Sequence, residues 1–162
     1  MRGPLIFLLW LSVCMSSCFK KNNGCGTEDN VIASSTEQKE VKAYLDSNSI
    51  TASLNPSGFY YKIVSQGSGT TPNLCSRITV SYKGQLTDGT VFDQESNQIF
   101  TLGDLIDGWK KGLPLIQSGG EIKLYIPPSL GYGSSGLKDN YGNVVVPGSS
   151  ILIFDINLLT VQ

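Results

Sequence analysis

The stretch from Val80 to Trp109 carries aromatic and apolar side chains beside a few isolated polar groups and glycines. Tyr82, Phe92 and Trp109 supply aromatic surface, and Asp93 is a carboxylate set among them. Ligand pockets combine an apolar lining with a few polar groups that orient the bound molecule. This stretch therefore predicts a pocket for an apolar group, with hydrogen-bonding groups close by.

Composition excludes several other kinds of chemistry. The 162-residue chain contains no histidine, which removes the usual general base of Ser-His-Asp and Cys-His enzymes and the commonest metal ligand. Its formal net charge is -1 at pH 7, so no basic surface favours nucleic acid. Its cysteines lack Cys-x-x-Cys spacing, which argues against redox catalysis and a zinc site. We therefore expect no metal, no cofactor and no nucleic-acid partner.

The elements that must position these groups are mostly strands. Asp88-Gly89 is a strong hairpin-turn signal. Residues 130–148 are rich in Gly, Ser and Asn and predict a long loop. The final strand is the most apolar and should lie near the centre of the sheet. Alternating apolar and polar side chains predict strands at 59–64, 77–86, 91–93, 99–102, 121–126 and 151–159.

A single internal helix is predicted from Leu105 to Leu115, ending near Ile116, and Pro114 should limit its length or kink it. Together with the strands, it predicts an α+β fold: a twisted antiparallel β-sheet wrapped around one short α-helix.

A second helix is predicted over residues 36–47, as a short N-terminal extension. Ser35 precedes Gln38 in capping-box spacing, and the apolar face defined by Val41 and Leu45 is narrow. This helix should pack on the domain or on a partner helix.

The first residues have the form of a secretory signal. The apolar run from Leu5 to Val13 is shorter than the roughly 20 residues that span a bilayer. Ser16-Ser17-Cys18 resembles a bacterial lipoprotein box, whereas Cys14 follows a bulkier residue. We predict a lipoprotein signal peptide at 1–17, lipidation of Cys18, and a cell-envelope location anchored to a bacterial membrane, in the periplasm or at the outer membrane. Ordinary secretion with cleavage nearby and a buried N-terminal strand are the alternatives.

The rest of the chain divides by composition into a flexible tether at 18–34, a helical extension and linker at 35–56, and a folded domain at 57–162. Cys25 and Cys75 remain as a pair, and such pairs usually form disulfides in oxidising compartments. A bridge would close a loop of about 50 residues, worth ~4 kcal/mol in the chain-entropy model. Two unrelated thiols are the alternative.

Four short motifs follow one another along the chain: Val80-Ser81-Tyr82-Lys83-Gly84, Gly89-Thr90-Val91-Phe92-Asp93, Ile106-Asp107-Gly108-Trp109, and Tyr132-Gly133 followed by Val145-Val146-Pro147. The chain then ends with Leu152-Ile153-Phe154-Asp155-Ile156. In order and spacing, these motifs and this ending resemble those of FKBP-type peptidyl-prolyl isomerases, over roughly residues 57–161. Each motif is weak alone, but their order and spacing together make chance agreement improbable.

The resemblance implies a pocket that binds proline and stabilises the twisted amide before it. It implies catalytic roles for Asp93, Tyr132 and Tyr82: the Tyr132 hydroxyl and the Ile106 N–H would hold substrate carbonyls, and Asp93 would bond to Tyr82. Trp109 would form the floor. Without the resemblance, the aromatic residues would be assigned to the core, because buried aromatics usually just pack. The implied substrate-binding residues are Tyr82, Phe92, Asp93, Leu105, Ile106, Trp109, Tyr132, Val145, Val146 and Phe154.

Three features differ from common members of the family. Gln98 stands where an aromatic is usual, the connection from 102–103 to 105–106 is shorter, and the loop at 130–144 is longer. We therefore expect an altered peptide preference.

The function that the resemblance implies is peptidyl-prolyl cis-trans isomerisation that assists folding of exported proteins. The partners would be proline-containing unfolded chains or peptides, the pocket would admit macrolide-type ligands, and membrane contact would come through the N-terminal lipid only. A non-catalytic peptide-binding chaperone on the same fold is the alternative, and a structural lipoprotein with a vestigial pocket is a third reading.

Overall fold

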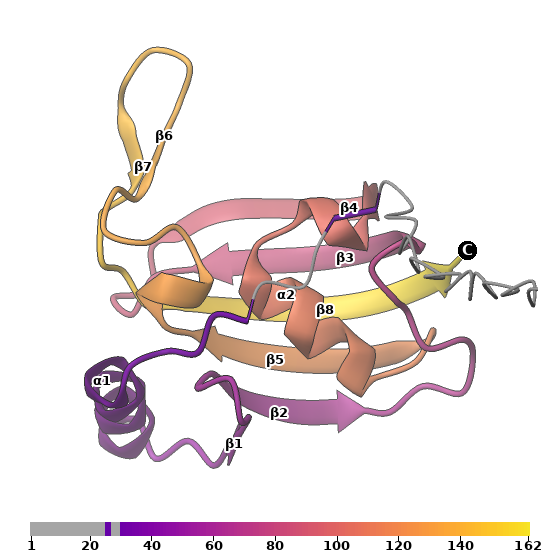
Figure 1. Cartoon of the computed structure of the whole chain (residues 1–162), viewed down its shortest axis with the longest axis horizontal. Helices are drawn as coiled ribbons and strands as arrows, with labels where there is room; N and C mark the ends of the chain where they lie inside the picture. The colour runs from indigo at the N-terminus through magenta and orange to yellow at the C-terminus, as the bar shows by residue number, and fades with distance from the viewer. Residues whose placement is uncertain (1–24, 27–29) are drawn as a thin grey trace, which may run out of the picture.

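The computed structural model describes residues 25–26 and 30–162 (Figure 1). The predicted signal peptide at 1–17 and the predicted lipidation site Cys18 lie outside the described residues. The helices are α1 (Ser35–Ser47) and α2 (Asp107–Gly112), with 3-10 turns η1 (Leu102–Asp104), η2 (Leu113–Leu115) and η3 (Pro128–Leu130). The strands are β1 (Ser53–Leu54), β2 (Tyr60–Ser65), β3 (Arg77–Gln85), β4 (Val91–Thr101), β5 (Gly120–Ile126), β6 (Leu137–Lys138), β7 (Val144–Val146) and β8 (Leu152–Val161).

Six of these strands form one antiparallel sheet, in the order β1-β2-β5-β8-β3-β4. The apolar strand β8 lies inside it, between β5 and β3, as its composition predicted. Helix α2 lies across one face of the sheet (Figure 1), and the main core fills the space between them. The α+β fold expected from the sequence is therefore confirmed.

Strand β4 is a single element, where the sequence predicted separate strands at 91–93 and 99–102. Two β-bulges explain the difference, because each inserts a residue and breaks the alternation of side chains along the strand. In one, Gln85 pairs with Val91 while Gly84 pairs with Asp93, which leaves Phe92 as the extra residue. The other lies near Asn97, which has a φ of 56°.

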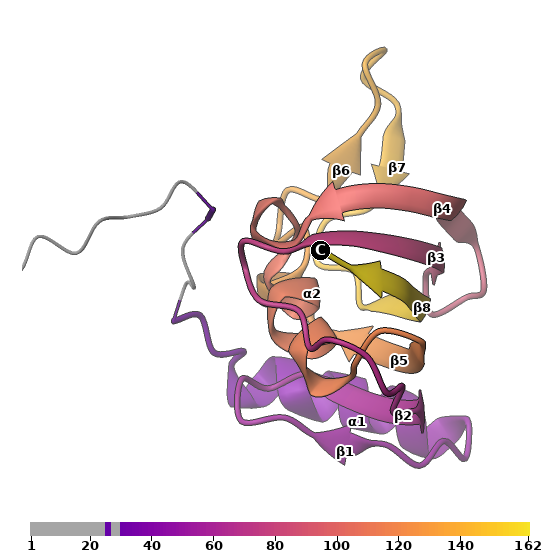
Figure 2. The same cartoon turned by 90° about the vertical axis from the view of Figure 1, so that its right-hand side faces the viewer.

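Helix α1 lies beside β1 and β2 (Figure 2). It packs on side chains that point away from the main core, because they alternate along their strands with the residues of that core. Val41 and Leu45 are buried there against Tyr60, Tyr125 and Ile153. Within the described residues, the apolar face of this helix therefore docks on the domain itself.

The capping box of α1 differs from the predicted pair of Ser35 and Gln38. Ser34 is the N-cap and Glu37 the third helical residue, so the box lies one position earlier. Part of the predicted linker after α1 also has regular structure, since Ser53–Leu54 pairs with β2 as strand β1.

The predicted helix from Leu105 to Leu115 is shorter than expected, because Pro114 lies in the 3-10 turn η2. Gly108 allows α2 to approach the sheet: a Cβ there would lie 2.5 Å from Cδ1 of Ile126. The predicted loop at 130–148 also contains the β6–β7 hairpin, which projects beyond the sheet (Figures 1 and 2). Within the described part of the chain, no helix is long and apolar enough to cross a membrane.

Candidate active site

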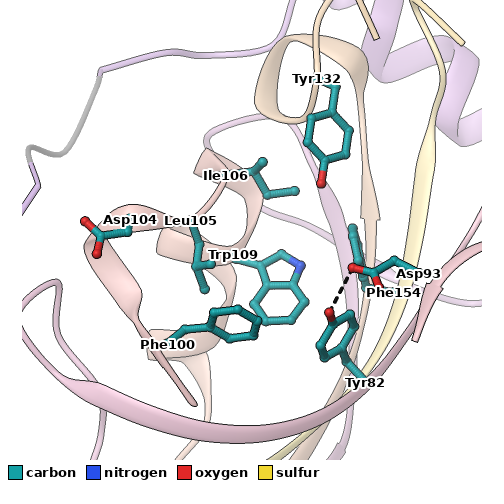
Figure 3. Close-up of a pocket in the computed structure, with 9 residues that line it drawn as sticks. All are labelled: Tyr82, Asp93, Phe100, Asp104, Leu105, Ile106, Trp109, Tyr132 and Phe154. Atoms are coloured by element: carbon teal, nitrogen blue, oxygen red, sulfur yellow. Dashed lines mark hydrogen bonds between the residues drawn. The ribbon is translucent and has the colours of Figure 1, made fainter. Parts of the chain in front are cut away.

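A cavity of about 280 Å³ opens between the sheet and the segment around α2 (Figure 3). Its volume lies just below the roughly 300–1,000 Å³ that is typical of ligand pockets, so it suits one small ring or side chain. Nine residues line it: Tyr82, Asp93, Phe100, Asp104, Leu105, Ile106, Trp109, Tyr132 and Phe154.

The indole of Trp109 is surrounded by three aromatic rings that meet it nearly edge-on. The ring centroids of Tyr82 and Phe154 each lie 5.2 Å from that of Trp109, with interplanar angles of 85° and 88°. The ring of Phe100 lies 6.3 Å away at 90°. Edge-to-face packing is one of the two favoured geometries for aromatic pairs, so this cluster is a stable apolar floor for the cavity.

The polar wall of the cavity is built by neighbouring strands. Gly84 in β3 pairs with Asp93 of β4 on one side and with Phe154 of β8 on the other. A Cβ at Gly84 would lie 2.7 Å from the rings of both Phe92 and Phe154, so only glycine leaves room for them. Because side chains alternate along a strand, Tyr82 lies on the same face as Gly84 and reaches the cavity.

The hydroxyl of Tyr82 donates a hydrogen bond of 2.8 Å to Oδ2 of Asp93 (Figure 3). Burial raises the pKa of Tyr82, and the hydrogen bond to Asp93 and the charge of that carboxylate raise it further. Tyr82 therefore stays protonated at neutral pH, and its single proton is committed to Asp93.

Two other donors remain available at the cavity. The hydroxyl of Tyr132 points into it from above (Figure 3) and has no hydrogen-bond partner among the described residues. Burial, followed by the charge of Asp93, raises the pKa of Tyr132, which keeps this group a donor. The backbone N–H of Ile106, the residue before α2, likewise donates to none of the described residues. The site thus combines an aromatic floor with two uncommitted donors.

The structure brings together seven of the ten predicted substrate-binding residues: Tyr82, Asp93, Leu105, Ile106, Trp109, Tyr132 and Phe154. Phe92, Val145 and Val146 do not line the cavity. Phe92, the bulged residue of β4, packs against Phe154, with 5.5 Å between the ring centroids. Val146 is buried in the core at the base of the β6–β7 hairpin, and Val145 packs against that core.

Two lining residues were not among the predicted site residues. Phe100 forms a wall from the end of β4, and Asp104 lies at the rim in η1. Gln98, which stands where the family usually has an aromatic residue, is exposed and lines no part of the cavity. The aromatic residues that recur between Val80 and Trp109 are the sequence signal that could have identified Phe100. The position of Asp104 depends on η1, whose short turn the sequence did not predict.

The wall that contains Leu105 is supported by a disulfide between Cys25 and Cys75. The segment around Cys75 binds η1 directly, since the N–H of Gly103 donates to the carbonyl of Leu74 at 2.8 Å. Gly103 also lies against Cys25: a Cβ on this glycine would be 2.6 Å from the Cys25 carbonyl oxygen. Part of the predicted tether is therefore attached to the domain beside the cavity.

These features agree with the comparisons with known proteins. The family of FKBP-type peptidyl-prolyl cis-trans isomerases matches residues 69–159, and the chain belongs to this family. The FKBP-type peptidyl-prolyl cis-trans isomerase FkpA of Escherichia coli K12 is 39% identical over 109 residues, which are 65% of this chain and 38% of the relative. The protein of the same name from Buchnera aphidicola subsp. Schizaphis graminum is 44% identical over 113 residues, 65% of this chain and 42% of the relative.

Solved structures support the same assignment. The crystal structure of FkpA from Escherichia coli has a TM-score of 0.67 and 34% identity, covering 78% of this chain and 60% of that one. A peptidyl-prolyl cis-trans isomerase from Pseudomonas syringae pv. tomato also has a TM-score of 0.67, with 26% identity, covering 85% of this chain and 99% of that one. The matched part of this chain spans only about two fifths of the length of the two curated relatives named above: 38% of the Escherichia coli protein and 42% of the Buchnera aphidicola protein.

Proposed function

We propose that this protein is a peptidyl-prolyl cis-trans isomerase that assists the folding of exported proteins. The observation that carries the proposal is the pairing of an aromatic floor with two uncommitted donors, the Tyr132 hydroxyl and the Ile106 N–H. An apolar floor accepts a pyrrolidine ring, and the donors can bind the carbonyls on either side of it. Proline-containing peptides and unfolded chains are the proposed substrates.

The reaction rotates a peptide bond whose barrier is about 18–20 kcal/mol because of amide resonance. The twisted amide has lost that resonance and its charge separation, so an apolar cavity disfavours the planar state relative to the twisted one. Donors that are already oriented can hold the carbonyl of the twisted amide without reorganising. The Tyr82–Asp93 hydrogen bond fixes the polar wall. No nucleophile or proton transfer is required.

The test is a protease-coupled isomerisation assay on proline peptides, with the chain purified from an export-competent bacterial host. We expect wild-type catalysis well above the spontaneous rate, and a kcat/KM about tenfold lower for Tyr132→Phe, because a neutral hydrogen bond contributes a net free energy of about 0.5–1.5 kcal/mol. A rate with wild-type protein that equals the spontaneous rate would contradict the proposed isomerase function. Retained peptide binding in that case would favour the non-catalytic chaperone. Calorimetry with a macrolide-type ligand tests whether the cavity also accepts that class.

The proposal extends to export and to a lipid anchor on Cys18, in the cell envelope. The Cys25–Cys75 disulfide supports export, because such bonds persist in oxidising compartments. Intact-mass spectrometry of the protein from the membrane fraction is expected to show a diacylated or triacylated N-terminal Cys18 and a mass two hydrogens below that of the free thiols. An unmodified mature N-terminus at another residue would indicate ordinary secretion instead.

A further inference from the structure

The carboxylate of Glu37 links the N-terminal helix to the chain segment that delivers Tyr132. One oxygen, Oε1, accepts a hydrogen bond of 2.9 Å from the backbone N–H of Ser129. The other, Oε2, accepts from the Ser129 hydroxyl at 3.1 Å and from the N–H and hydroxyl of Ser34, each at 2.9 Å. One carboxylate thus closes the capping box of α1 and also bonds to η3, 92 residues along the chain.

The peptide group that Glu37 contacts is the same one that holds Tyr132. The carbonyl of Pro128 accepts hydrogen bonds from the N–H of Gly131 at 3.0 Å and from the N–H of Gly133 at 2.8 Å, the amides on either side of Tyr132. The N–H of that peptide bond belongs to Ser129 and donates to Glu37. Because a peptide group is planar and rigid, fixing its N–H direction fixes the direction of its carbonyl.

Charge strengthens this arrangement. Partial burial opposes ionisation of Glu37, but the hydrogen bonds from Ser34 and Ser129 outweigh it and lower the pKa of the carboxyl. An ionised acceptor makes shorter and stronger hydrogen bonds than a neutral one. Hydrogen bonds in series also polarise each other, so a carboxylate on the Ser129 N–H makes the Pro128 carbonyl a better acceptor for Gly131 and Gly133.

Helix α1 is a firm support for such a contact. Val41 and Leu45 are fully buried against Tyr125, which lies in β5 just before the chain turns into η3. The segment before the helix is also fixed, since Ala33 is buried and its N–H donates to the carbonyl of Ser57 at 2.9 Å. Glu37 therefore projects from a helix held on the same strand that leads to Tyr132.

We propose that Glu37 is a positioning residue for Tyr132, acting through the Pro128–Ser129 peptide group. The N-terminal helix is then a working part of the isomerase site. Only the effect of Glu37 on catalysis rests on the proposed function. The effect of Glu37 on the backbone around Tyr132 does not depend on any activity.

A double-mutant cycle between Glu37→Ala and Tyr132→Phe tests the link. We expect Glu37→Ala to lower kcat/KM about fivefold when Tyr132 is present and by less than about twofold in the Tyr132→Phe background, the scale of coupling between groups in one network. Glu37→Gln retains an acceptor for the Ser129 N–H and should recover part of the loss. Glu40→Ala, which removes an exposed carboxylate from the same helix without touching the hydrogen bonds of Glu37, is the matched control and should stay near wild type. Equal losses in both backgrounds would overturn the inference.

Amide hydrogen exchange measured by NMR separates this inference from the proposed function. In Glu37→Ala, the amides of Gly131 and Gly133 should exchange about tenfold faster than in wild type, because weaker hydrogen bonds open more readily. The amides of the distant β3–β8 ladder should keep their rates. Unchanged exchange at Gly131 and Gly133 would contradict the inference whatever the activity. If the wild-type protein has no isomerase activity but Gly131 and Gly133 exchange faster in Glu37→Ala, the proposed function is wrong. The positioning role of Glu37 remains in that case.

Discussion

The hydroxyl of Tyr82 donates to the carboxylate of Asp93 across the β3–β4 ladder, at 2.8 Å. The two residues are diagonal neighbours, because the direct partner of Tyr82 is Glu95 and that of Asp93 is Gly84. Side chains at such diagonal positions share a face and can reach each other. The register of the sheet therefore sets the polar wall of the cavity.

Removing this hydrogen bond should weaken both the wall and the fold. In Tyr82→Phe we expect about 1 kcal/mol less stability towards urea and a kcat/KM about threefold lower, the usual range for one partly exposed hydrogen bond. Tyr61→Phe is the matched control, since Tyr61 packs against the same core and its hydroxyl bonds to none of the described residues. An unchanged kcat/KM in Tyr82→Phe would show that the Asp93 contact has no role in catalysis.

Asp104 should influence which peptides are preferred. Asp93 and Asp104 are the charged residues among the nine that line the cavity, so its lining is acidic. Peptides with Lys before proline should have a kcat/KM about two- to threefold above that of matched Glu peptides, and Asp104→Asn should reduce this ratio. The preference should shrink in high salt. Glu40→Gln, which removes an equal charge on α1, is the control; if it lowers the ratio equally, the effect is one of net charge alone.

Stability should decline at high pH because three tyrosines have raised pKa values. Burial is the first cause for each, and for Tyr125 it raises the pKa to about 12. Below about pH 10 both folded and unfolded chains keep these phenolic protons. Above it the unfolded chain loses protons that the folded chain retains, so the free energy of unfolding falls as pH rises.

Urea unfolding between pH 8 and about 11 measures this decline. Tyr125→Phe should flatten it, whereas Tyr141→Phe, at a position 92% exposed, should leave its slope unchanged. The same slope in Tyr125→Phe and wild type would refute the assignment to Tyr125.

Gly108→Ala should displace α2 from the sheet and disturb the cavity floor at the neighbouring Trp109. The new Cβ would meet three side-chain atoms of Ile126, the nearest at 2.5 Å. Overpacking of this kind typically costs about 1–3 kcal/mol, measurable by urea unfolding. Ile126→Val removes the nearest atom and should partly restore the stability of Gly108→Ala. If Ile126→Val does not restore stability to Gly108→Ala, the clash with Ile126 is not the cause of the lost stability.

Much of the fold could be predicted from local patterns. Alternation along β3 and β5 identified these strands to within a residue at each end, and the apolar composition of β8 placed it inside the sheet. The resemblance of ordered motifs anticipated most of the cavity, including Trp109 and Tyr132. Such predictions succeed where a short-range pattern and the final environment of a residue agree.

Other features depended on contacts between distant segments. Phe92 is the extra residue of a bulge, and no single-strand pattern shows this, because a bulge is defined by the partner strand. Val146 belongs to one of the four family motifs, but it lies at the base of the β6–β7 hairpin and is buried in the core. Asp104 reaches the rim because η1 is short and is held by the segment around Cys75.

Residue types alone thus determined which chemistry this chain could hold: an apolar floor, tyrosine hydroxyls and a carboxylate, without a histidine base. Only the tertiary structure decided which donors stay free. Tyr82 is committed to Asp93, whereas Tyr132 is not, because cross-strand register places the first pair in contact. The contact between Glu37 and Ser129 likewise exists only after helix and sheet have packed, since hydrogen bonds need atoms within about 3 Å, whatever their separation along the chain.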